Sequence, residues 1–118
     1  MRRMTAMVTF DTKNLEGLEV LVLRGEIDMY QAPKIREALL AACDRCSRGV
    51  AVDLSEVSYM DSSGIATLIE GLQWAKRCEG RFMLIGVQTS VMGTLRLAKL
   101  HEIFELFPTQ EAALASLA

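Results

Sequence analysis

The segment that decides the fold is Val52–Ile65, with the sequence VDLSEVSYMDSSGI. Its first residues close a short apolar run that starts at Val50 and predicts a buried strand ending at Leu54. The polar residues 55–60 predict a turn. Asp61 and the serines after it precede apolar residues spaced by three and four, the pattern of an amphipathic helix capped by side-chain oxygens. The segment therefore predicts a strand, a loop and a helix in succession.

Strands and helices alternate along the rest of the chain. Further strands are expected at Thr5–Lys13, Leu18–Leu23, Arg81–Val87 and Ile103–Phe107, and further helices at Ala32–Cys46, at Ser90–Lys99 and after a Thr109 cap. The first two strands are expected to pair as a hairpin, and the later strand–helix–strand order requires parallel crossovers. The sequence thus predicts an α/β fold, with one mixed and mostly parallel β-sheet packed against about four helices. We expect a single domain spanning residues 1–118.

Composition excludes several classes of function. The chain has 118 residues, of which 51% are hydrophobic and 24% charged, which suits one buried core. A net charge of -2 argues against non-specific nucleic-acid binding. No apolar run approaches the roughly 18 residues of a membrane span, so we expect no membrane insertion. The basic N-terminus has no long apolar run after it, so no signal peptide is predicted and a cytoplasmic location is expected.

Catalysis, metal binding and cofactor binding are not predicted. His101 is the only histidine, and the serines of Asp61–Gly64 lack the G-x-S-x-G elbow of a hydrolase. Cys43 and Cys46 form a C-x-x-C pair, which can be a redox or metal pair or two small residues at a helix end. A structural zinc site needs about four ligands, and no second such pair exists. The role of the two cysteines stays open.

Asp61–Gly64 can be read in two ways. One is an ordinary helix N-cap. The other is a phosphorylation site, because a hydroxyl at a helix N-terminus after a strand is accessible to a kinase. A phosphate adds about -1.5 to -2 charge, which the helix N-terminus tolerates but neighbouring carboxylates, Asp61 and Asp28, do not. The docking surface would then change while the fold survives.

The string DLSEVSYMDSSGI resembles the motif of STAS domains, in particular the anti-sigma factor antagonists of bacteria. The segment Arg24–Asp28 and the residues from Ser90 to Phe104 also look like the family, so the resemblance covers essentially the whole chain. Two departures from the family pattern, Gln31 and Pro33, lie at the start of the first expected helix, beside the expected docking face.

The resemblance implies a phosphorylation-controlled partner switch. In such antagonists the serine after the motif's aspartate is phosphorylated by a partner that is both anti-sigma factor and serine kinase, of the GHKL ATPase type. The unphosphorylated form binds that partner and frees the sigma factor, and a phosphatase resets the system, for which the PP2C type is the candidate. By this resemblance Ser62 is the phosphoacceptor. The implied partner-binding residues are Asp28, Asp61, Ser62, Ser63 and Gly64.

A second function is compatible with the same motif. Stand-alone STAS proteins also serve as cytoplasmic subunits of ABC-type lipid transporters, bound to the permease. Ser62 favours the switch, because some transporter subunits carry threonine there. The sequence leaves open which sigma factor or stress is involved and what the oligomeric state is.

Overall fold

The computed structural model describes residues 8–45 and 48–118. Within these residues the chain forms five strands and four helices. In chain order they are β1 (Thr9–Leu15), β2 (Leu18–Ile27), α1 (Ala32–Arg45), β3 (Gly49–Met60), α2 (Ser62–Arg77), β4 (Arg81–Ile85), α3 (Thr89–Leu97), β5 (Glu105–Phe107) and α4 (Gln110–Ala115). The alternation of strands and helices confirms the predicted α/β class.

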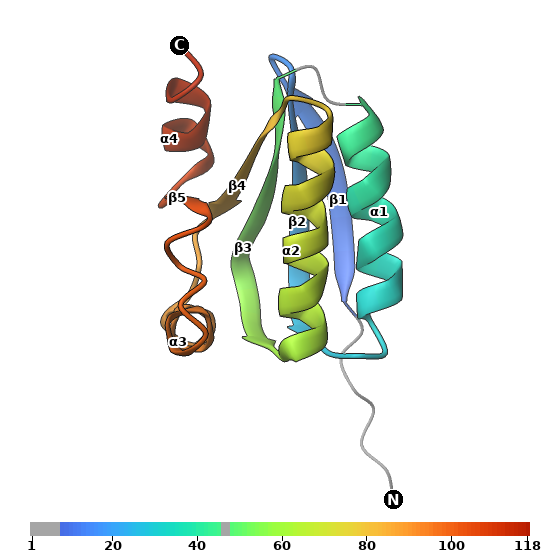
Figure 1. Ribbon diagram of the computed structural model, residues 1–118, viewed down its shortest axis with the longest axis vertical. Helices are drawn as coiled ribbons and strands as arrows, with labels where there is room; N and C mark the ends of the chain where they lie inside the picture. The colour runs from blue at the N-terminus through green and yellow to red at the C-terminus, as the bar shows by residue number, and fades with distance from the viewer. Residues whose placement is uncertain (1–7, 46–47) are drawn as a thin grey trace, which may run out of the picture.

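The strands form one mixed sheet in the order β1-β2-β3-β4-β5 (Figure 1). β1 and β2 make an antiparallel hairpin, and each later strand pairs in parallel with the one before it. The prediction of a mixed and mostly parallel sheet is therefore confirmed. β1 continues to Leu15, beyond its predicted end at Lys13, whereas residues 5–7 of the predicted strand and Cys46 of the predicted helix lie outside the described residues.

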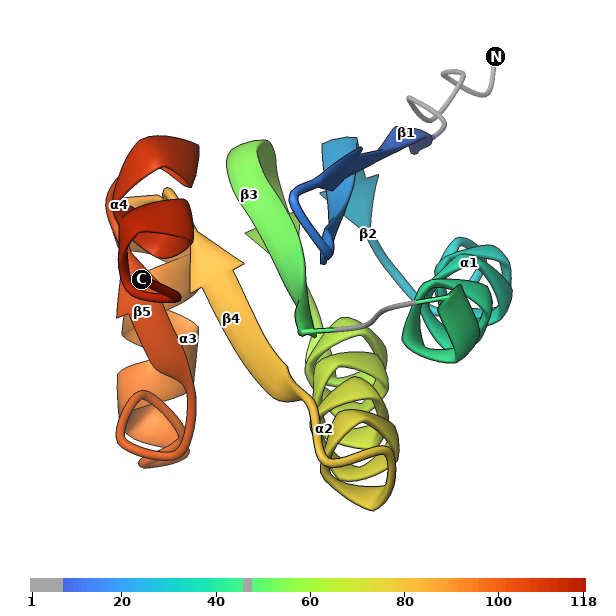
Figure 2. The same cartoon turned by 90° about the horizontal axis from the view of Figure 1, so that it is seen from above.

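Apolar layers lie on both faces of the sheet. On one face α1, α2 and α3 bury side chains such as Leu39, Leu68 and Leu95 against the strands. On the other face α4 buries Ala113 against a second apolar cluster, and Figure 2 shows α4 on the side away from α1 and α2. Because both faces are covered, all side chains of residues 18–23 are buried, as parallel sheets require.

The predicted turn at residues 55–60 is wrong. β3 continues as a strand to Met60 and β2 continues beside it to Ile27, with two register shifts between them. β4 ends at Ile85, opposite Asp53, so the later part of β3 extends past the end of its neighbour. The side chains of residues 55–60 are mostly exposed, and in the sequence this polar pattern resembles that of a turn.

The start of α3 takes the place of a neighbouring strand along this part of β3. The Gln88 side chain donates a hydrogen bond to the Ser55 carbonyl at 2.8 Å, and the Ser90 hydroxyl donates one to the Ser58 carbonyl at 2.9 Å. The extended end of β3 is thereby held in place, and with it the position at which α2 begins.

Candidate functional site

The candidate site is the first turn of α2, which Asp61 caps. Asp61 has extended backbone, and its Oδ1 accepts hydrogen bonds from the backbone N–H of Ser63 at 2.9 Å and of Gly64 at 3.3 Å. These two N–H groups have no partner within the helix, so the carboxylate satisfies them. The N-cap predicted from the sequence is confirmed.

The charge of Asp61 is stabilised by its surroundings. The pKa of its carboxyl lies below the ordinary value of 3.8, chiefly because the Ser63 hydroxyl donates a hydrogen bond to it. Partial burial opposes this effect, and the backbone N–H groups of Gly64, Ser63 and Met29 add to it. Asp61 is therefore a fixed negative charge at neutral pH, bonded to its own helix and to the loop that follows β2.

The two serines of the motif differ in their surroundings. The Ser63 hydroxyl donates to Asp61 Oδ1 and its side chain is half-buried. Ser62, the first residue of α2, is exposed, and its side chain has no hydrogen-bond partner within the described residues. Among the described residues, Ser62 therefore presents an unbonded hydroxyl to solvent, while Ser63 belongs to the capping structure.

Asp28 lies in the loop after β2, next to the first turn of α2. Its Oδ1 accepts hydrogen bonds from the backbone N–H of Tyr30 at 3.0 Å and of Gln31 at 3.1 Å. Its carbonyl oxygen accepts from the N–H of Ala32, the first residue of α1. The backbone N–H of Asp61 in turn donates to the Ile27 carbonyl at 3.1 Å, which joins the two loops. Asp28 and Asp61 thus follow adjacent strands at the same edge of the sheet.

Gln31, one of the departures from the family pattern, has a structural role. Its side-chain oxygen accepts a hydrogen bond from the backbone N–H of Val8 at 3.4 Å. This bond ties the segment before β1 to the loop that leads into α1. Gln31 therefore helps to hold the Asp28 loop.

Gly64 is buried, so its contribution to docking is indirect. A Cβ atom built at this position would lie 2.5 Å from Met60 Cγ and 2.9 Å from Ile27 Cγ2. Only a residue without a side chain lets the first turn of α2 approach the ends of β2 and β3 this closely. Gly64 thereby sets the position of the exposed Ser62.

Three large exposed side chains come from the same elements as the site. Met29 and Tyr30 are 63% and 81% exposed in the Asp28 loop, and Tyr59 is 50% exposed near the end of β3. Tyrosine is enriched at the centres of protein interfaces. The sequence alone does not single out Tyr59, because the polar residues around it predict a turn; its position two residues before Asp61 is the signal that could have found it.

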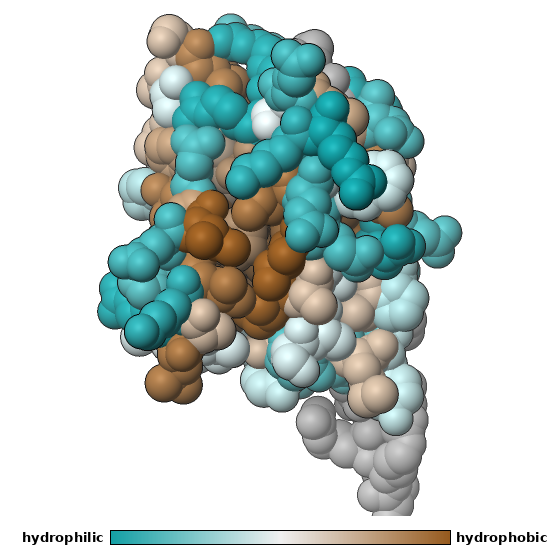
Figure 3. All heavy atoms as spheres, viewed as in Figure 1, coloured by the Kyte–Doolittle hydropathy of each residue, from teal (hydrophilic) through white to brown (hydrophobic). Residues whose placement is uncertain are grey.

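A second apolar surface lies apart from this site. Figure 3 shows apolar side chains gathered between α2 and α3. α2 and the turn after α3 carry the half-buried side chains of Ile69, Leu72 and Leu100, which pack against the core. The exposed Ile103 lies in the same turn.

Other candidate residues are distributed elsewhere in the fold. Cys43 is buried in α1, with its Sγ 3.9 Å from the Gly71 carbonyl oxygen, whereas Cys46 lies outside the described residues. His101 lies in the turn between α3 and β5. Within residues 8–45 and 48–118, no three His, Cys, Asp or Glu side chains form a group that could hold a metal ion. No helix of the described part has the length and apolar character to span a bilayer.

Comparison with known proteins identifies the family. The sequence family model described as the STAS domain matches residues 9–113 of this chain. The chain belongs to the STAS domain family. Strand β3, the Asp61 cap and α2 are thus parts of a STAS domain, as the motif predicts.

Relatives and solved structures extend this finding. The "Anti-sigma-B factor antagonist" of Listeria monocytogenes is 27% identical over 103 residues, which cover 87% of this chain and 90% of the relative. An anti-sigma factor antagonist from Mycobacterium paratuberculosis has a crystal structure with a TM-score of 0.86 and 26% identity, covering 97% of this chain and 98% of that one. The antagonist SpoIIAA, solved unphosphorylated, shares the STAS fold with a TM-score of 0.80 at 21% identity, covering 92% of this chain and 96% of that one.

Proposed function

We propose that this STAS protein is an anti-sigma factor antagonist and that phosphorylation of Ser62 controls its choice of partner. In this proposal the unphosphorylated form binds an anti-sigma factor that is also a serine kinase of the GHKL ATPase type. Binding releases a sigma factor, and a phosphatase, for which the PP2C type is our candidate, removes the phosphate. The names of the Listeria and Mycobacterium relatives support the antagonist part of the proposal.

The contrast between Ser62 and Ser63 is the single observation that supports the phosphorylation site. The Ser63 hydroxyl donates to Asp61, so a phosphate on it would remove that bond and lie against the capping carboxylate. The exposed Ser62 hydroxyl makes no such bond within the described residues, so a kinase could modify it and leave the capping bonds of Asp61 intact. The residue that the family motif implies is thus also the one that can react without loss of structure.

Electrostatics explains how a phosphate on Ser62 would act. The dipole of the helix N-terminus favours an added anion, which keeps α2 folded. The charge of Asp61 is already present beside it, and Asp28 lies in the adjoining loop. A phosphate would therefore concentrate negative charge on the surface formed by these residues, together with Met29, Tyr30 and Tyr59. A partner that recognises this surface in its unmodified form should bind the phosphorylated form more weakly, because the charge and shape that it contacts have changed.

The test is a phosphorylation assay with the candidate kinase. The protein, Ser62→Ala and Ser63→Ala are incubated with the kinase and ATP, and phosphate is located by mass spectrometry. We expect transfer to the wild type and to Ser63→Ala, and none to Ser62→Ala. Ser62→Asp should weaken kinase binding in a titration. Absence of transfer, or transfer that persists in Ser62→Ala, would contradict the proposed site.

The transporter-subunit alternative is distinguished by affinity purification from membranes. The proposed regulator should recover the ATPase kinase, whereas a transporter subunit should recover an ABC permease. The proposal describes a regulator rather than an enzyme and requires no cofactor, because its chemistry belongs to the kinase and phosphatase. Since sigma factors act on RNA polymerase, the proposed function implies a location in the cytoplasm.

A further inference from the structure

Within the described sheet, the outer edge of β1 has no neighbouring strand. β1 is first in the strand order and pairs with β2 alone among the described strands, and Figure 2 shows it at the end of the sheet opposite β5. An open edge of this kind presents backbone N–H and C=O groups that can pair with another strand. Whether pairing is favourable depends on the side chains along β1.

The charges of β1 are complementary to a second copy of the same strand. Thr12 lies midway between Asp11 and Lys13, and all three side chains are exposed. If two copies of β1 pair in antiparallel orientation about a two-fold axis through Thr12, Asp11 of each copy lies opposite the partner's Lys13. Opposite charges in directly facing positions stabilise a sheet, whereas a two-fold axis through Asp11 or through Lys13 would place two like charges opposite each other.

Both charged groups remain available for such a pair. Asp11 accepts a hydrogen bond from Arg24 at 2.8 Å, yet its side chain is still 70% exposed. Lys13 makes no ion pair within the described residues. Strand pairing would therefore not need to break an ion pair of Lys13.

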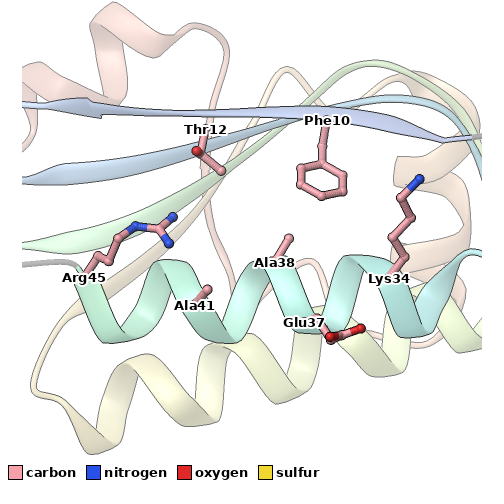
Figure 4. A pocket seen from close by; sticks show the side chains of 7 residues that line it. All are labelled: Phe10, Thr12, Lys34, Glu37, Ala38, Ala41 and Arg45. Atoms are coloured by element: carbon pink, nitrogen blue, oxygen red, sulfur yellow. The ribbon is translucent and has the colours of Figure 1, made fainter.

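A groove of about 400 Å³ lies between β1 and α1, and Figure 4 shows Phe10 and Thr12 pointing from the strand toward Ala38 and Ala41 of the helix. Lys34 lies at one end of this groove and Arg45 at the other.

The charges of α1 also match across the same axis. Glu37 and Arg45 lie one helical turn to either side of Ala41, and all three line the groove. An axis that passes Thr12 and Ala41 would therefore place Glu37 of one copy opposite the partner's Arg45. Glu37 makes no ion pair within the described residues, and Arg45, which donates to Glu19 at 3.1 Å, is half exposed.

We propose that two copies of this chain associate through antiparallel pairing of their β1 strands. The two five-stranded sheets then form one continuous sheet, with the α1 helices antiparallel to each other above the joined edges. Because the two-fold axis is perpendicular to the strands, the carboxyl ends of β2 and β3 in one copy point in the direction opposite to those in the other copy. The two Ser62 sites would lie at opposite ends of the dimer, each open to its own partner.

Charge-reversed variants test this proposal in analytical ultracentrifugation. In Asp11→Lys and in Lys13→Asp, each homodimer faces like charges at both positions, so its dissociation constant should rise at least roughly tenfold. A mixture of the two variants restores two opposite-charge pairs and should form a heterodimer close to wild-type affinity. Circular dichroism checks that each variant is folded, since Asp11→Lys also removes an exposed ion pair of small energetic value.

Matched controls separate this effect from a change in net charge. Glu102→Lys and Lys99→Asp make equivalent charge changes at exposed positions after α3, and they should leave the association unchanged. A wild-type protein that stays monomeric up to about 1 mM would overturn the proposal. So would a mixture of folded variants that fails to associate, or single variants that dimerise like the wild type.

Discussion

Ile27 and Met60 are paired in register where β2 and β3 leave the sheet. The residues that follow them, Asp28 and Asp61, therefore start two loops side by side, joined by the hydrogen bond from the Asp61 N–H to the Ile27 carbonyl. The Ile27 and Met60 side chains also form the surface against which Gly64 packs. One pair of core residues thus sets the position of the capping carboxylate, of the exposed serine after it and of the neighbouring loop.

Loss of the Asp61 cap should destabilise the protein. Asp61→Ala leaves the N–H groups of Ser63 and Gly64 without their partner, and we expect a cost of about 0.5–2 kcal/mol in the free energy of unfolding. Urea denaturation at pH 7 measures it. Asp61→Asn is the matched control, because asparagine also caps helices and should recover most of the loss.

The stabilisation by Asp61 should depend on pH in the acid range. Its pKa is lower in the folded protein than the ordinary 3.8, so the folded state favours the charged carboxylate. Its contribution is fully present above 3.8 and is lost as the pH falls through the lower folded value. The difference in stability between the wild type and Asp61→Ala should therefore be constant from about pH 7 to pH 5 and should shrink toward pH 3. A difference that grows with acid would show that the shift has the opposite sign.

Gly64 and Gly93 should respond in opposite ways to alanine. Gly64→Ala places a Cβ against Met60 and Ile27 and should cost about 1–3 kcal/mol. At Gly93, inside α3, a Cβ meets nothing within 4 Å, so Gly93→Ala should stabilise by about 0.5–1 kcal/mol through helix propensity. Thermal and urea unfolding measure both, and equal effects would contradict the packing described for Gly64.

The two serines should differ in their effect on stability. Ser62→Ala should change the free energy of unfolding by less than about 0.5 kcal/mol, since its side chain is exposed. Ser63→Ala removes the hydroxyl bonded to Asp61 and should cost about 1 kcal/mol. The same comparison checks the assignment of Ser62 as free for modification, because a large loss in Ser62→Ala would reveal a structural role.

Leu68 should be among the costly positions of α2. It is 1% exposed and packs in the larger apolar cluster, so Leu68→Ala should cost about 2–5 kcal/mol. Ala66, exposed on the same helix, offers a control in which Ala66→Ser should change stability little. A near-neutral Leu68→Ala would mean that the buried face of α2 is misassigned.

Local interactions explain what could be predicted. The spacing of Ile65, Leu68 and Leu72 indicates a helix because the period of an amphipathic helix is a property of neighbouring residues. The cap at Asp61 and the cap at Thr109, whose hydroxyl oxygen accepts from the Ala112 N–H, depend on contacts two or three residues away. The turn of the β1–β2 hairpin is local in the same way, because Leu15 and Leu18 pair directly across it. These features follow from the sequence by itself.

Contacts between distant segments decided the rest. The strand character of residues 55–60 depends on pairing with β2 and on the Gln88 and Ser90 side chains, which no local pattern reveals. The need for glycine at position 64 arises from the Ile27 and Met60 side chains beneath it. The free hydroxyl of Ser62, in contrast with that of Ser63, depends on which way each side chain points once α2 is seated on the sheet. The sequence alone therefore determined the order of the elements and the residues of the motif, whereas tertiary packing decided which of those residues support the fold and which face solvent.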